Sequence, residues 1–371
     1  MSRRIHVLHA VWNFDLGGLE RVVAELSRAL DPEVFETSVL SLAGHGAMAV
    51  NVPASVRLHR ASPQGRLSLV NPVALSADIA GISPALVHTH SGVWFKAARA
   101  AHRAGIGAIV HTDHGRPHPD PLAARVLDGL AARYTDAVVA VSSPLAAYLR
   151  RRVVPASTEV RVIPNGVDTN VFRSGGAGAV RARLGIPADA LVVGTVGRLE
   201  PVKAFDALVR AMAHVNAARM KPAHLVLVGD GSQAGRLAAV AEQTGTRATV
   251  HLVGRQADIP TWLAAFDVFA LSSLSEGTSM SLLEAMASEC CPVVTAVGGN
   301  ADVLGPGLAH RLVPPGDERA LASSLADALT TSGARRCDAA RARERVVSAY
   351  SLDAMVRAYQ DVYRSVLGGT P

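Results

Sequence analysis

Two glutamates stand in the otherwise uncharged segment SEGTSMSLLEAM, at positions 275–286. Glu276 follows a buried-strand pattern, and Glu284 lies about one turn into the helix that Thr278 or Ser279 would cap. A carboxylate among small and apolar neighbours is costly unless it is hydrogen-bonded, and sugar and ribose hydroxyls are suitable donors. The helix N-terminus between the acids also favours a phosphate. From spacing alone, a loop acid and a salt-bridged helix residue explain the pair equally well.

A second charged pair follows an earlier strand pattern. The strand is expected to end at Gly197, and Arg198 and Lys203 come next, before a helical pattern. Only three of the 37 Lys+Arg residues are lysines, so a lysine on this strand-to-helix loop suggests a compact positive charge for a phosphate. For an isolated pair, ordinary surface charge is the simpler explanation.

Glycines and histidines mark two further loops. Gly17 and Gly18 follow the first strand pattern, where a backbone without side chains can approach a ligand at the start of a helix. No Gly-Lys-Ser/Thr follows them, so this is not a Walker loop. His111 and His114 lie at the carboxyl end of a strand predicted at 108–112. Each could bind a substrate hydroxyl, and a hydrogen-bonded structural histidine is the alternative.

The stretch LVGDGSQAG resembles a dinucleotide fingerprint only superficially. Its glycines, Gly229, Gly231 and Gly235, are spaced one residue too widely. The next strand ends in HLVGRQ, with Gly254 and Arg255 but no acid to hold a ribose. A nicotinamide-dependent enzyme is therefore disfavoured.

Alternating elements must position these residues. Short apolar, β-branched runs alternate with longer Ala/Leu/Arg segments of helical period, which predicts parallel sheets with right-handed crossovers. Such sheets bind ligands at the carboxyl ends of their strands. The strands are expected at 5–9, 37–42, 56–59, 86–90, 108–112, 137–141, 160–163, 191–196, 224–228, 249–253, 268–271, 293–296 and 310–313.

Length and turn signals divide the chain. A chain of 371 residues exceeds one ordinary core, and Asn165-Gly166 and Gly175-Gly176 mark a seam. We expect two Rossmann-like, doubly wound α/β domains facing a cleft, at residues 1–170 and 171–350. Residues 351–371 are expected to form a helix with one apolar stripe, which could pack back on the N-terminal domain.

Composition excludes several classes of protein. Hydrophobic residues make up 49% and charged residues 18%, as in a globular chain, and no apolar run reaches the roughly 18 residues of a membrane span. Three cysteines, with Cys290 and Cys291 adjacent, give no disulfide framework and no zinc spacing, which favours a reducing cytoplasm. Aromatics are 4%, and the one tight basic cluster is Arg150–Arg152, so nucleic acid is disfavoured as a partner.

Taken together, the chain resembles the family-4 retaining glycosyltransferases of the GT-B fold. Six stretches occur in that family's order: GGLE, IPNGVDTNVF, VGRLEPVKAFD, LVGDG, SEGTSMSLLEAMA and PVVTAVGGN. The resemblance covers nearly the whole chain. HTDHG together with SEGTSMSLLEAMAS is most similar to the bacterial exopolysaccharide-type sugar transferases. One departure is Ala204, because the family usually has glycine after the lysine.

The resemblance implies roles for individual residues. Arg198 and Lys203 would clamp the departing diphosphate. Glu276 would lie beside the donor sugar, and Glu284 would bind the ribose hydroxyls. His114 would lie near the reacting carbon. The remaining donor contacts would come from Gly17, Gly18, Gly229, Gly254, Arg255, Gly277, Thr278 and Ser279.

The implied reaction is transfer of a sugar from a UDP-sugar or GDP-sugar to a hydroxyl acceptor, with retention at the anomeric carbon and without a metal. The N-terminal domain would take the acceptor and the C-terminal domain the nucleotide sugar. We expect a cytoplasmic enzyme of polysaccharide, glycolipid or other glycoconjugate synthesis, with a lipid-linked acceptor and reversible contact with the inner membrane as further expectations. The mild net charge of +6 is most simply explained as a solvated basic surface, and contact with an anionic membrane surface or a phosphorylated substrate is the alternative. The alternatives are a GT-B nucleotide-sugar epimerase and a non-catalytic subunit that binds sugar nucleotides.

Overall fold

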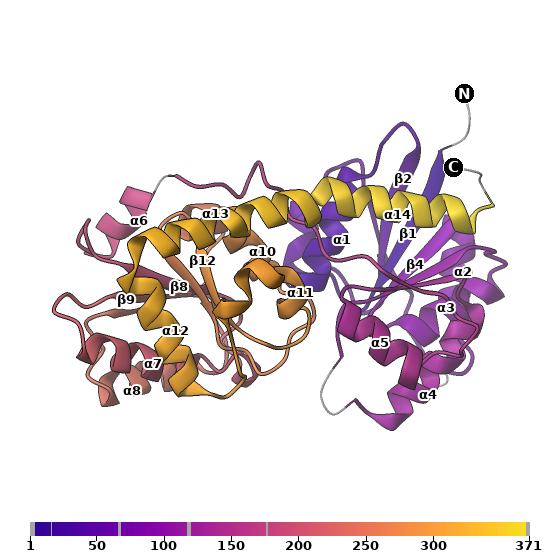
Figure 1. The fold of residues 1–371 in the computed structure, drawn as a ribbon. Helices are drawn as coiled ribbons and strands as arrows, with labels where there is room; N and C mark the ends of the chain where they lie inside the picture. The colour runs from indigo at the N-terminus through magenta and orange to yellow at the C-terminus, as the bar shows by residue number, and fades with distance from the viewer. Residues whose placement is uncertain (1–3, 16, 66–67, 117–119, 176, 369–371) are drawn as a thin grey trace. The chain divides into compact units, whose positions relative to one another are not determined.

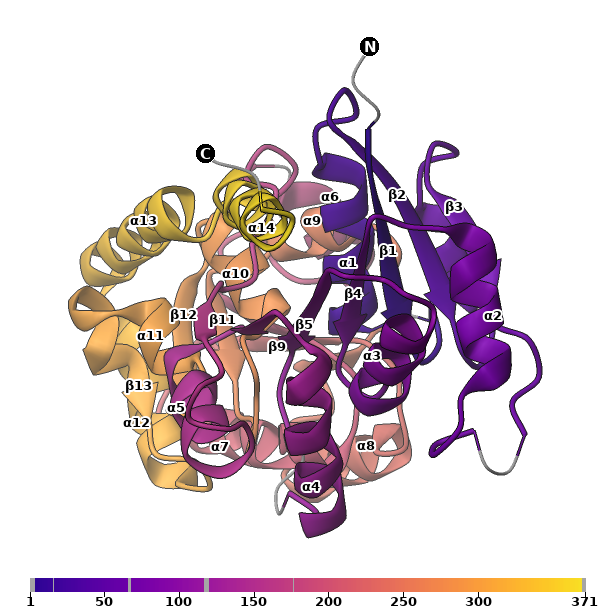
Figure 2. The same cartoon turned by 90° about the vertical axis from the view of Figure 1, so that its right-hand side faces the viewer.

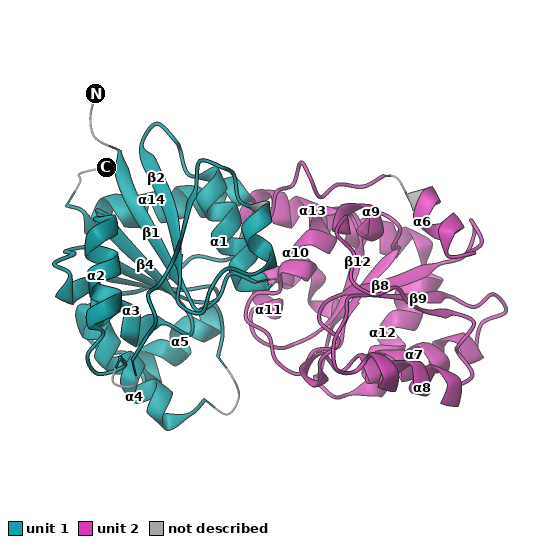
Figure 3. Ribbon diagram, turned by 180° about the vertical axis from the view of Figure 1, so that it is seen from behind, with its two compact units in different colours: residues 1–166, 352–371 teal, residues 167–351 magenta. Residues whose placement is uncertain are grey.

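The computed structural model describes residues 4–15, 17–65, 68–116, 120–175 and 177–368. The chain divides into two compact units, coloured separately in Figure 3. Unit 1 comprises residues 1–166 and 352–371, and unit 2 comprises residues 167–351. These divisions fall within a few residues of those expected, and the acceptor and donor roles given to the two domains stay predictions. Each unit is an α/β fold around one parallel sheet (Figure 1).

Unit 1 has a seven-stranded parallel sheet in the order β3-β2-β1-β4-β5-β6-β7. Its strands are β1 (Ile5–Val11), β2 (Phe35–Ser41), β3 (Arg57–Arg60), β4 (Leu86–His90), β5 (Ile109–Asp113), β6 (Ala137–Ala140) and β7 (Val160–Val162). Its helices are α1 (Gly18–Ala29), α2 (Val73–Ile82), α3 (Trp94–Arg103), α4 (Leu122–Ala131), α5 (Ser143–Arg152) and α14 (Leu352–Val366), with 3-10 turns η1 (Ala47–Asn51) and η2 (Ala132–Tyr134).

Helices cover both faces of this sheet because its strands carry apolar side chains on both faces. Leu8 and Ala10 of β1 pack with α2, α3 and α5 on one face, whereas Val11 packs with α1 on the other. Figure 2 shows α2 and α3 on one side of the sheet and α1 and α14 on the other. The C-terminal helix α14 belongs to unit 1, and its Tyr359 and Tyr363 are buried there, at 1% and 0% exposed.

Unit 2 has a six-stranded parallel sheet in the order β10-β9-β8-β11-β12-β13. Its strands are β8 (Val192–Val196), β9 (His224–Val228), β10 (Val250–Leu252), β11 (Val268–Leu271), β12 (Cys291–Thr295) and β13 (Leu312–Val313). Its helices are α6 (Ala177–Arg183), α7 (Phe205–Ala217), α8 (Ala234–Gln243), α9 (Ile259–Leu263), α10 (Met280–Ala287), α11 (Asn300–Leu304), α12 (Glu318–Thr330) and α13 (Ser332–Ala349), with 3-10 turns η3 (Pro201–Lys203) and η4 (Pro306–Arg311).

Two apolar layers sandwich the unit 2 sheet. One contains α9, α10, α11 and α13, and the other contains α7, α8 and α12. Cys290 lies in the first layer and Cys291 in the second, and both are fully buried. Burial raises the pKa of the Cys291 thiol to about 12 and raises that of Cys290 further. Both cysteines are therefore packing residues of the core with protonated thiols near pH 7.

Each strand expected from the sequence overlaps one of the 13 strands found among the described residues. The predicted doubly wound α/β class is confirmed. The boundaries differ by up to two residues, as at β12, which begins at Cys291 instead of Val293. No helix in the described part of the chain is both long and apolar enough to cross a bilayer. Peripheral membrane contact stays a prediction.

Candidate active site

In unit 2, the candidate donor residues lie on loops at the carboxyl edge of the sheet. Arg198 follows β8, Gly229 follows β9, Arg255 follows β10 and Glu276 follows β11. Parallel strands place these loops at one edge, where doubly wound folds bind ligands. The structure therefore positions them as the sequence predicts.

Lys203 and Glu276 form an ion pair across two of these loops. The Lys203 ammonium lies 2.6 Å from Glu276 Oε1, and the two side chains are only 16% and 11% exposed. The Ser273 hydroxyl donates a second hydrogen bond of 2.6 Å to the same oxygen. The sequence singled out the lysine and the glutamate separately, but it did not indicate that they touch or that Ser273 joins them.

Backbone contacts make these two loops one assembly. The Ser272 hydroxyl donates to the carbonyl oxygens of Lys203 and Ala204, at 2.8 and 3.0 Å, and the Leu274 N–H donates to the Val202 carbonyl at 2.8 Å. Ala204 has φ 46° and ψ 39°, in the left-handed region. Glycine adopts that conformation with little cost, which explains why glycine is the usual residue there and shows that alanine is strained.

Arg198 differs from Lys203 in its surroundings. Its side chain is exposed, and among the described residues its guanidinium forms no ion pair. The structure does not join Arg198 to the Lys203–Glu276 pair. The backbone of the next residue, Leu199, is held in place, because its N–H donates a hydrogen bond to the Asp230 carbonyl at 2.9 Å. An exposed, uncommitted guanidinium on a fixed loop can bind an incoming oxyanion through its fork of N–H groups.

The segment that carries Glu284 is the start of α10. Ser279 is the N-cap, and its side chain accepts from the Leu282 N–H at 3.4 Å, so the predicted cap is confirmed. Thr278 and Ser279 are themselves buried. Glu284 is 2% exposed on a helix buried nearly all round. A carboxylate so deep in a protein requires specific stabilisation.

Gly298 is a site residue that the sequence analysis missed. It has φ 53°, and a β-carbon there would lie 2.0 Å from the Glu276 carbonyl oxygen. The next residue, Gly299, donates its N–H to the Gly277 carbonyl at 2.7 Å. The glycine pair therefore packs directly on the loop that carries Glu276. The stretch VGGN signals a turn, but nothing in the sequence indicates which backbone it approaches.

Gly229 serves close packing between neighbouring loops. It has φ 142°, and a β-carbon there would lie 1.9 Å from the Gly197 carbonyl oxygen. Its N–H donates to the Gly254 carbonyl at 2.9 Å. The loops after β8, β9 and β10 are thus held together without side chains. Arg255 is exposed beside them.

In unit 1, Gly17 is the N-cap of α1 and Gly18 its first residue. Gly17 has an extended backbone, with φ −163°. A β-carbon at Gly17 would lie 2.3 Å from Glu20 Oε2, so the carboxylate of Glu20 covers this turn. The Glu20 carboxylate therefore occupies the space that a side chain at Gly17 would take. A role of the two glycines in binding the diphosphate stays a prediction.

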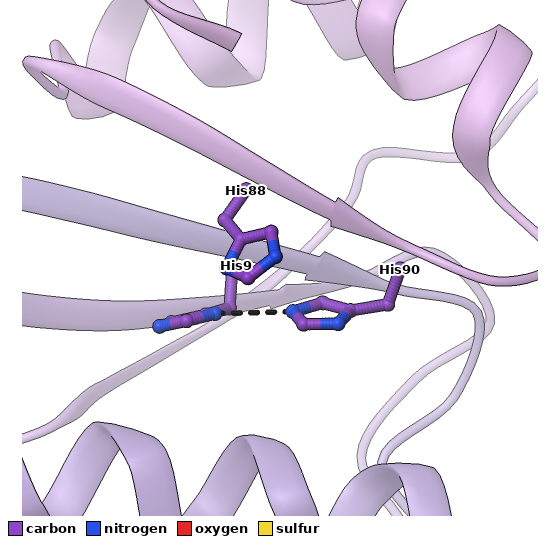
Figure 4. Close-up of side chains that lie close together, drawn as sticks. All are labelled: His9, His88 and His90. Atoms are coloured by element: carbon purple, nitrogen blue, oxygen red, sulfur yellow. Dashed lines mark hydrogen bonds between the residues drawn. The ribbon is translucent and has the colours of Figure 1, made fainter. Parts of the chain in front are cut away.

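A chain of hydrogen-bonded histidines runs from β1 through β4 to the residue after β5, and Figure 4 shows its members His9 and His90 beside His88. His9 Nδ1 lies 3.1 Å from His90 Nε2, and His90 Nδ1 lies 3.0 Å from His114 Nε2. His114 is also held by its main chain, whose N–H donates to the Ser91 hydroxyl at 2.8 Å. The predicted site residue His114 is thus oriented through its ring and its backbone by the end of β4.

These histidines are neutral near pH 7. Burial lowers the pKa of His9 and of His114 to about 3, and burial together with neighbouring histidines lowers those of His88 and His90 well below 6.5. Each neutral ring has one N–H, so the two hydrogen bonds from His9 to His90 to His114 must run in the same direction along the chain.

One group could hold a metal ion among the described residues: His9, His88 and His90, whose ring nitrogens lie within 4.8 Å of one another. Both ring nitrogens of His88 and of His90 are already hydrogen-bonded, whereas His9 Nε2 is buried without a hydrogen-bond partner among the described residues. His88 contacts the Tyr363 hydroxyl at 2.7 Å and the Thr112 hydroxyl at 2.8 Å, and His9 and His90 contact each other. An ion there would have to displace these hydrogen bonds.

His111 is a structural histidine, as the alternative interpretation proposed. Its ring stacks on Trp94 of α3, with centroids 3.8 Å apart, and Nδ1 lies 3.0 Å from the Thr89 hydroxyl. Burial lowers its pKa well below 6.5. Arg116, two residues after His114, pairs with Asp113, Asp120 and Asp128 at 2.8–3.1 Å.

Both halves of the chain match models of sugar-transferring enzymes. Residues 190–331 match the family described as glycosyl transferases group 1, and residues 16–171 match glycosyltransferase family 4. This chain belongs to these glycosyltransferases. The matched ranges include the unit 2 loops that carry Arg198 and Glu276 and, in unit 1, the histidines His88, His90 and His114, but they begin after His9.

Relatives of the glycosyltransferase agree with this assignment. The chain is 26% identical over 343 residues to the glycosyltransferase EpsF of Bacillus subtilis, covering 84% of each protein. It is 33% identical over 273 residues to a D-inositol 3-phosphate glycosyltransferase of Stackebrandtia nassauensis, covering 68% of this chain and 61% of that one. Anabaena Alr3699/HepE, solved with UDP and glucose, superposes with a TM-score of 0.85 at 22% identity, over 98% of this chain and all of that one. The expected GT-B fold is confirmed.

Proposed function

We propose that this glycosyltransferase moves a sugar from a nucleoside-diphosphate sugar to a hydroxyl acceptor, with retention at the anomeric carbon. The observation that carries the proposal is the pairing of Lys203 with Glu276 at the carboxyl edge of the unit 2 sheet. The complexes of HepE with UDP and with UDP-glucose favour a uridine nucleotide as the donor.

Positive side chains would supply the catalytic electrostatics. As the bond to the sugar breaks, negative charge develops on the leaving diphosphate. Arg198 and Lys203 would stabilise that charge. The Arg198 side chain is exposed, so it can contact parts of the diphosphate that Lys203 alone would leave uncovered. Glu276 would accept from a hydroxyl of the donor sugar through its carboxylate, which Lys203 and Ser273 hold in place. Glu284 would accept from the ribose. Gly17, Gly18 and His114 keep the roles that the resemblance implies as part of the proposal.

Retention would be tested by the configuration of the product. With UDP-sugar and an accepted hydroxyl compound, the anomeric coupling in the NMR spectrum of the first product should match that of the donor. Inversion would overturn the stereochemical part of the proposal. Incubation without an acceptor distinguishes the alternatives, since an epimerase would change the sugar while a non-catalytic subunit would bind UDP and leave it unchanged.

Activity should survive removal of divalent metal. The sequence has no Asp-x-Asp, and the described residues that could hold an ion lie in unit 1, not on the donor loops. Turnover should change less than about twofold in excess EDTA, because cationic side chains replace the ion in stabilising the diphosphate. Initial rates with and without EDTA provide the measurement. Complete loss that Mg²⁺ or Mn²⁺ restores would contradict this expectation.

Calorimetric titrations with UDP should distinguish the roles of Glu276 and Glu284. Glu284→Gln keeps the shape of the side chain but loses charge-assisted hydrogen bonds, so UDP should bind about tenfold more weakly. The loss should shrink for 2′-deoxy-UDP, which lacks one hydroxyl. Glu276→Gln should leave UDP affinity nearly unchanged and lower turnover by about 10–100-fold, because its partner is the sugar.

The exposed Glu242 supplies the control, since Glu242→Gln removes an acid of the same unit that lies in the last turn of α8, outside the site loops, and pairs with Arg247. It should change neither UDP affinity nor turnover. Equal UDP affinity in Glu276→Gln and Glu284→Gln would contradict the proposal that Glu284 binds the ribose.

A further inference from the structure

A pocket of about 490 Å³ lies beside the carboxyl ends of the first three strands of unit 1. Trp12 follows β1, Leu42 follows β2, and Arg60 ends β3. The segment after β3 and Lys96 of α3 complete the lining; the lining residues from that segment are Ala61, Ser62, Pro63 and Gln64. The pocket occupies the edge of the sheet at which such folds bind ligands, and the donor loops of unit 2 are not part of it.

The charges that line this pocket are all positive. Arg60 and Lys96 are its two charged residues, and within the described parts of the chain neither forms an ion pair. Arg57, at the other end of the same strand, does pair, with Glu36 at 2.5 Å. Two cations at one pocket without an acid create a positive potential that an anion would neutralise.

One acid, Asp78, helps to shape the lining of the pocket. Both oxygens of Asp78 accept from Ser62, one from its N–H at 2.8 Å and one from its hydroxyl at 2.7 Å. This fixes the segment after β3. Lys96 donates to the Ser68 hydroxyl at 2.9 Å, so a neutral group is its partner.

Two further groups indicate a ligand with hydroxyls. Trp12 is 54% exposed, whereas Trp94 and Trp262 are each 3% exposed. An exposed indole offers an apolar face on which a sugar ring can stack. Gln64 donates through its amide to the Ser62 carbonyl at 2.6 Å, while its buried Oε1 has no hydrogen-bond partner among the described residues. Such an oxygen can accept from a ligand hydroxyl.

We infer that this pocket binds a sugar or polyol that carries an oxyanion, a phosphate or a carboxylate, and that this compound is the acceptor of the transfer. Arg60 would bind the oxyanion through its guanidinium fork and Lys96 as a point charge, with the ring over Trp12 and a hydroxyl on Gln64. The role as acceptor rests on the proposed function, whereas anion binding rests on the pocket itself.

Calorimetric titration of the full chain would test the inference. Glucose 6-phosphate, glucuronate and glucose would be titrated with and without saturating UDP, which occupies the diphosphate site. At least one of the two anions should bind about tenfold or more tightly than glucose, and the tighter of them identifies phosphate or carboxylate as the preferred group. Equal affinity for all three compounds, or no binding of either anion, would overturn the inference.

Variants locate the binding. Arg60→Gln and Lys96→Met should each weaken anion binding about tenfold or more while leaving UDP affinity unchanged, and Trp12→Leu should weaken all three sugars. Arg57→Gln is the matched control, because it removes an arginine from the same strand outside the pocket. Anion binding that is the same in wild type, Arg60→Gln and Lys96→Met overturns the inference, as does an equal loss in Arg57→Gln.

The two proposals can fail separately. UDP binding serves as the folding check for each variant, and if Arg60→Gln is unfolded, Lys96→Met carries the test. If wild type fails to bind UDP or to transfer sugar, the proposed function falls, while the titration without UDP still reports on the pocket.

Discussion

Between pH 7.5 and pH 5.5, unit 1 is expected to lose about 6 kcal/mol of its free energy of unfolding. Five histidines are responsible: the partly buried His114 and four that are 0–1% exposed, His9, His88, His90 and His111. Burial lowers the pKa of His9 and of His114 from 6.5 to about 3 and lowers the pKa of each of the other three well below 6.5. Each stays neutral in the folded unit and takes up a proton near its ordinary pKa when the unit unfolds.

The direction of the effect follows from this proton uptake. Below pH 6.5 the unfolded chain binds more protons than the folded unit, so stability is complete above that pH and falls as the pH drops. Each histidine contributes about 1.4 kcal/mol over these two pH units. Asp128 opposes the trend by about 1 kcal/mol, because burial raises its pKa to about 6 and the folded state takes up the proton. The expected loss is a large part of the roughly 5–15 kcal/mol that stabilises a typical domain.

Urea unfolding at a series of pH values would measure this. Trp262 is the tryptophan of unit 2, so fluorescence in a Trp262→Phe background reports on unit 1. Near pH 5.5, the slope of unfolding free energy with pH should correspond to about four protons, and to about three in His111→Phe, which keeps a ring against Trp94. His102→Gln, at an exposed position of α3, should leave the slope unchanged. A slope of one proton or less in wild type would contradict the expectation.

The histidine chain also shows what the sequence could and could not predict. The alternation in VHTH places His88 and His90 on one face of a strand, which the sequence allows one to expect. That His9 lies across from them depends on β1 pairing with β4, two strands far apart in the chain. That Tyr363 caps the group depends on α14 returning to unit 1 from the C-terminus. Periodicity predicts elements, but it does not predict which distant elements become neighbours.

The donor loops show the same division. Strand patterns were sufficient to place Arg198 and Glu276 at the carboxyl edge of a sheet, because that edge follows from topology. The bond between Lys203 and Glu276 joins residues 73 positions apart, and its existence depends on β8 pairing directly with β11. The sequence does not reveal the role of Gly298 for the same reason. This position must be occupied by glycine because the Glu276 backbone lies against it, and the two come together only in the folded loops.

Turnover is expected to fall by about 10²–10³ in Arg198→Ala and in Lys203→Ala, as when an electrostatic donor to a transition state is lost. Arg198→Lys should restore little of the loss if the guanidinium fork is required. The controls are Arg247→Ala and Lys221→Ala, which break exposed pairs of unit 2 with Glu242 and Asp189. Both should retain wild-type rates. Wild-type turnover in either Arg198→Ala or Lys203→Ala would contradict the proposal that these two side chains bind the diphosphate.

Lys203 needs one more variant, because its removal also leaves the carboxylate of Glu276 without its cation. That loss destabilises unit 2 in addition to any effect on catalysis, since an unpaired charge at a site 11% exposed is costly. The double variant Lys203→Ala/Glu276→Gln removes both charges, so thermal unfolding should return towards that of wild type. If the lysine serves only to neutralise Glu276, turnover of the double variant should equal that of Glu276→Gln alone. If it stabilises the leaving diphosphate, stability should recover while turnover stays at least about 10² below that of Glu276→Gln, because no cation remains at this position when the bond breaks.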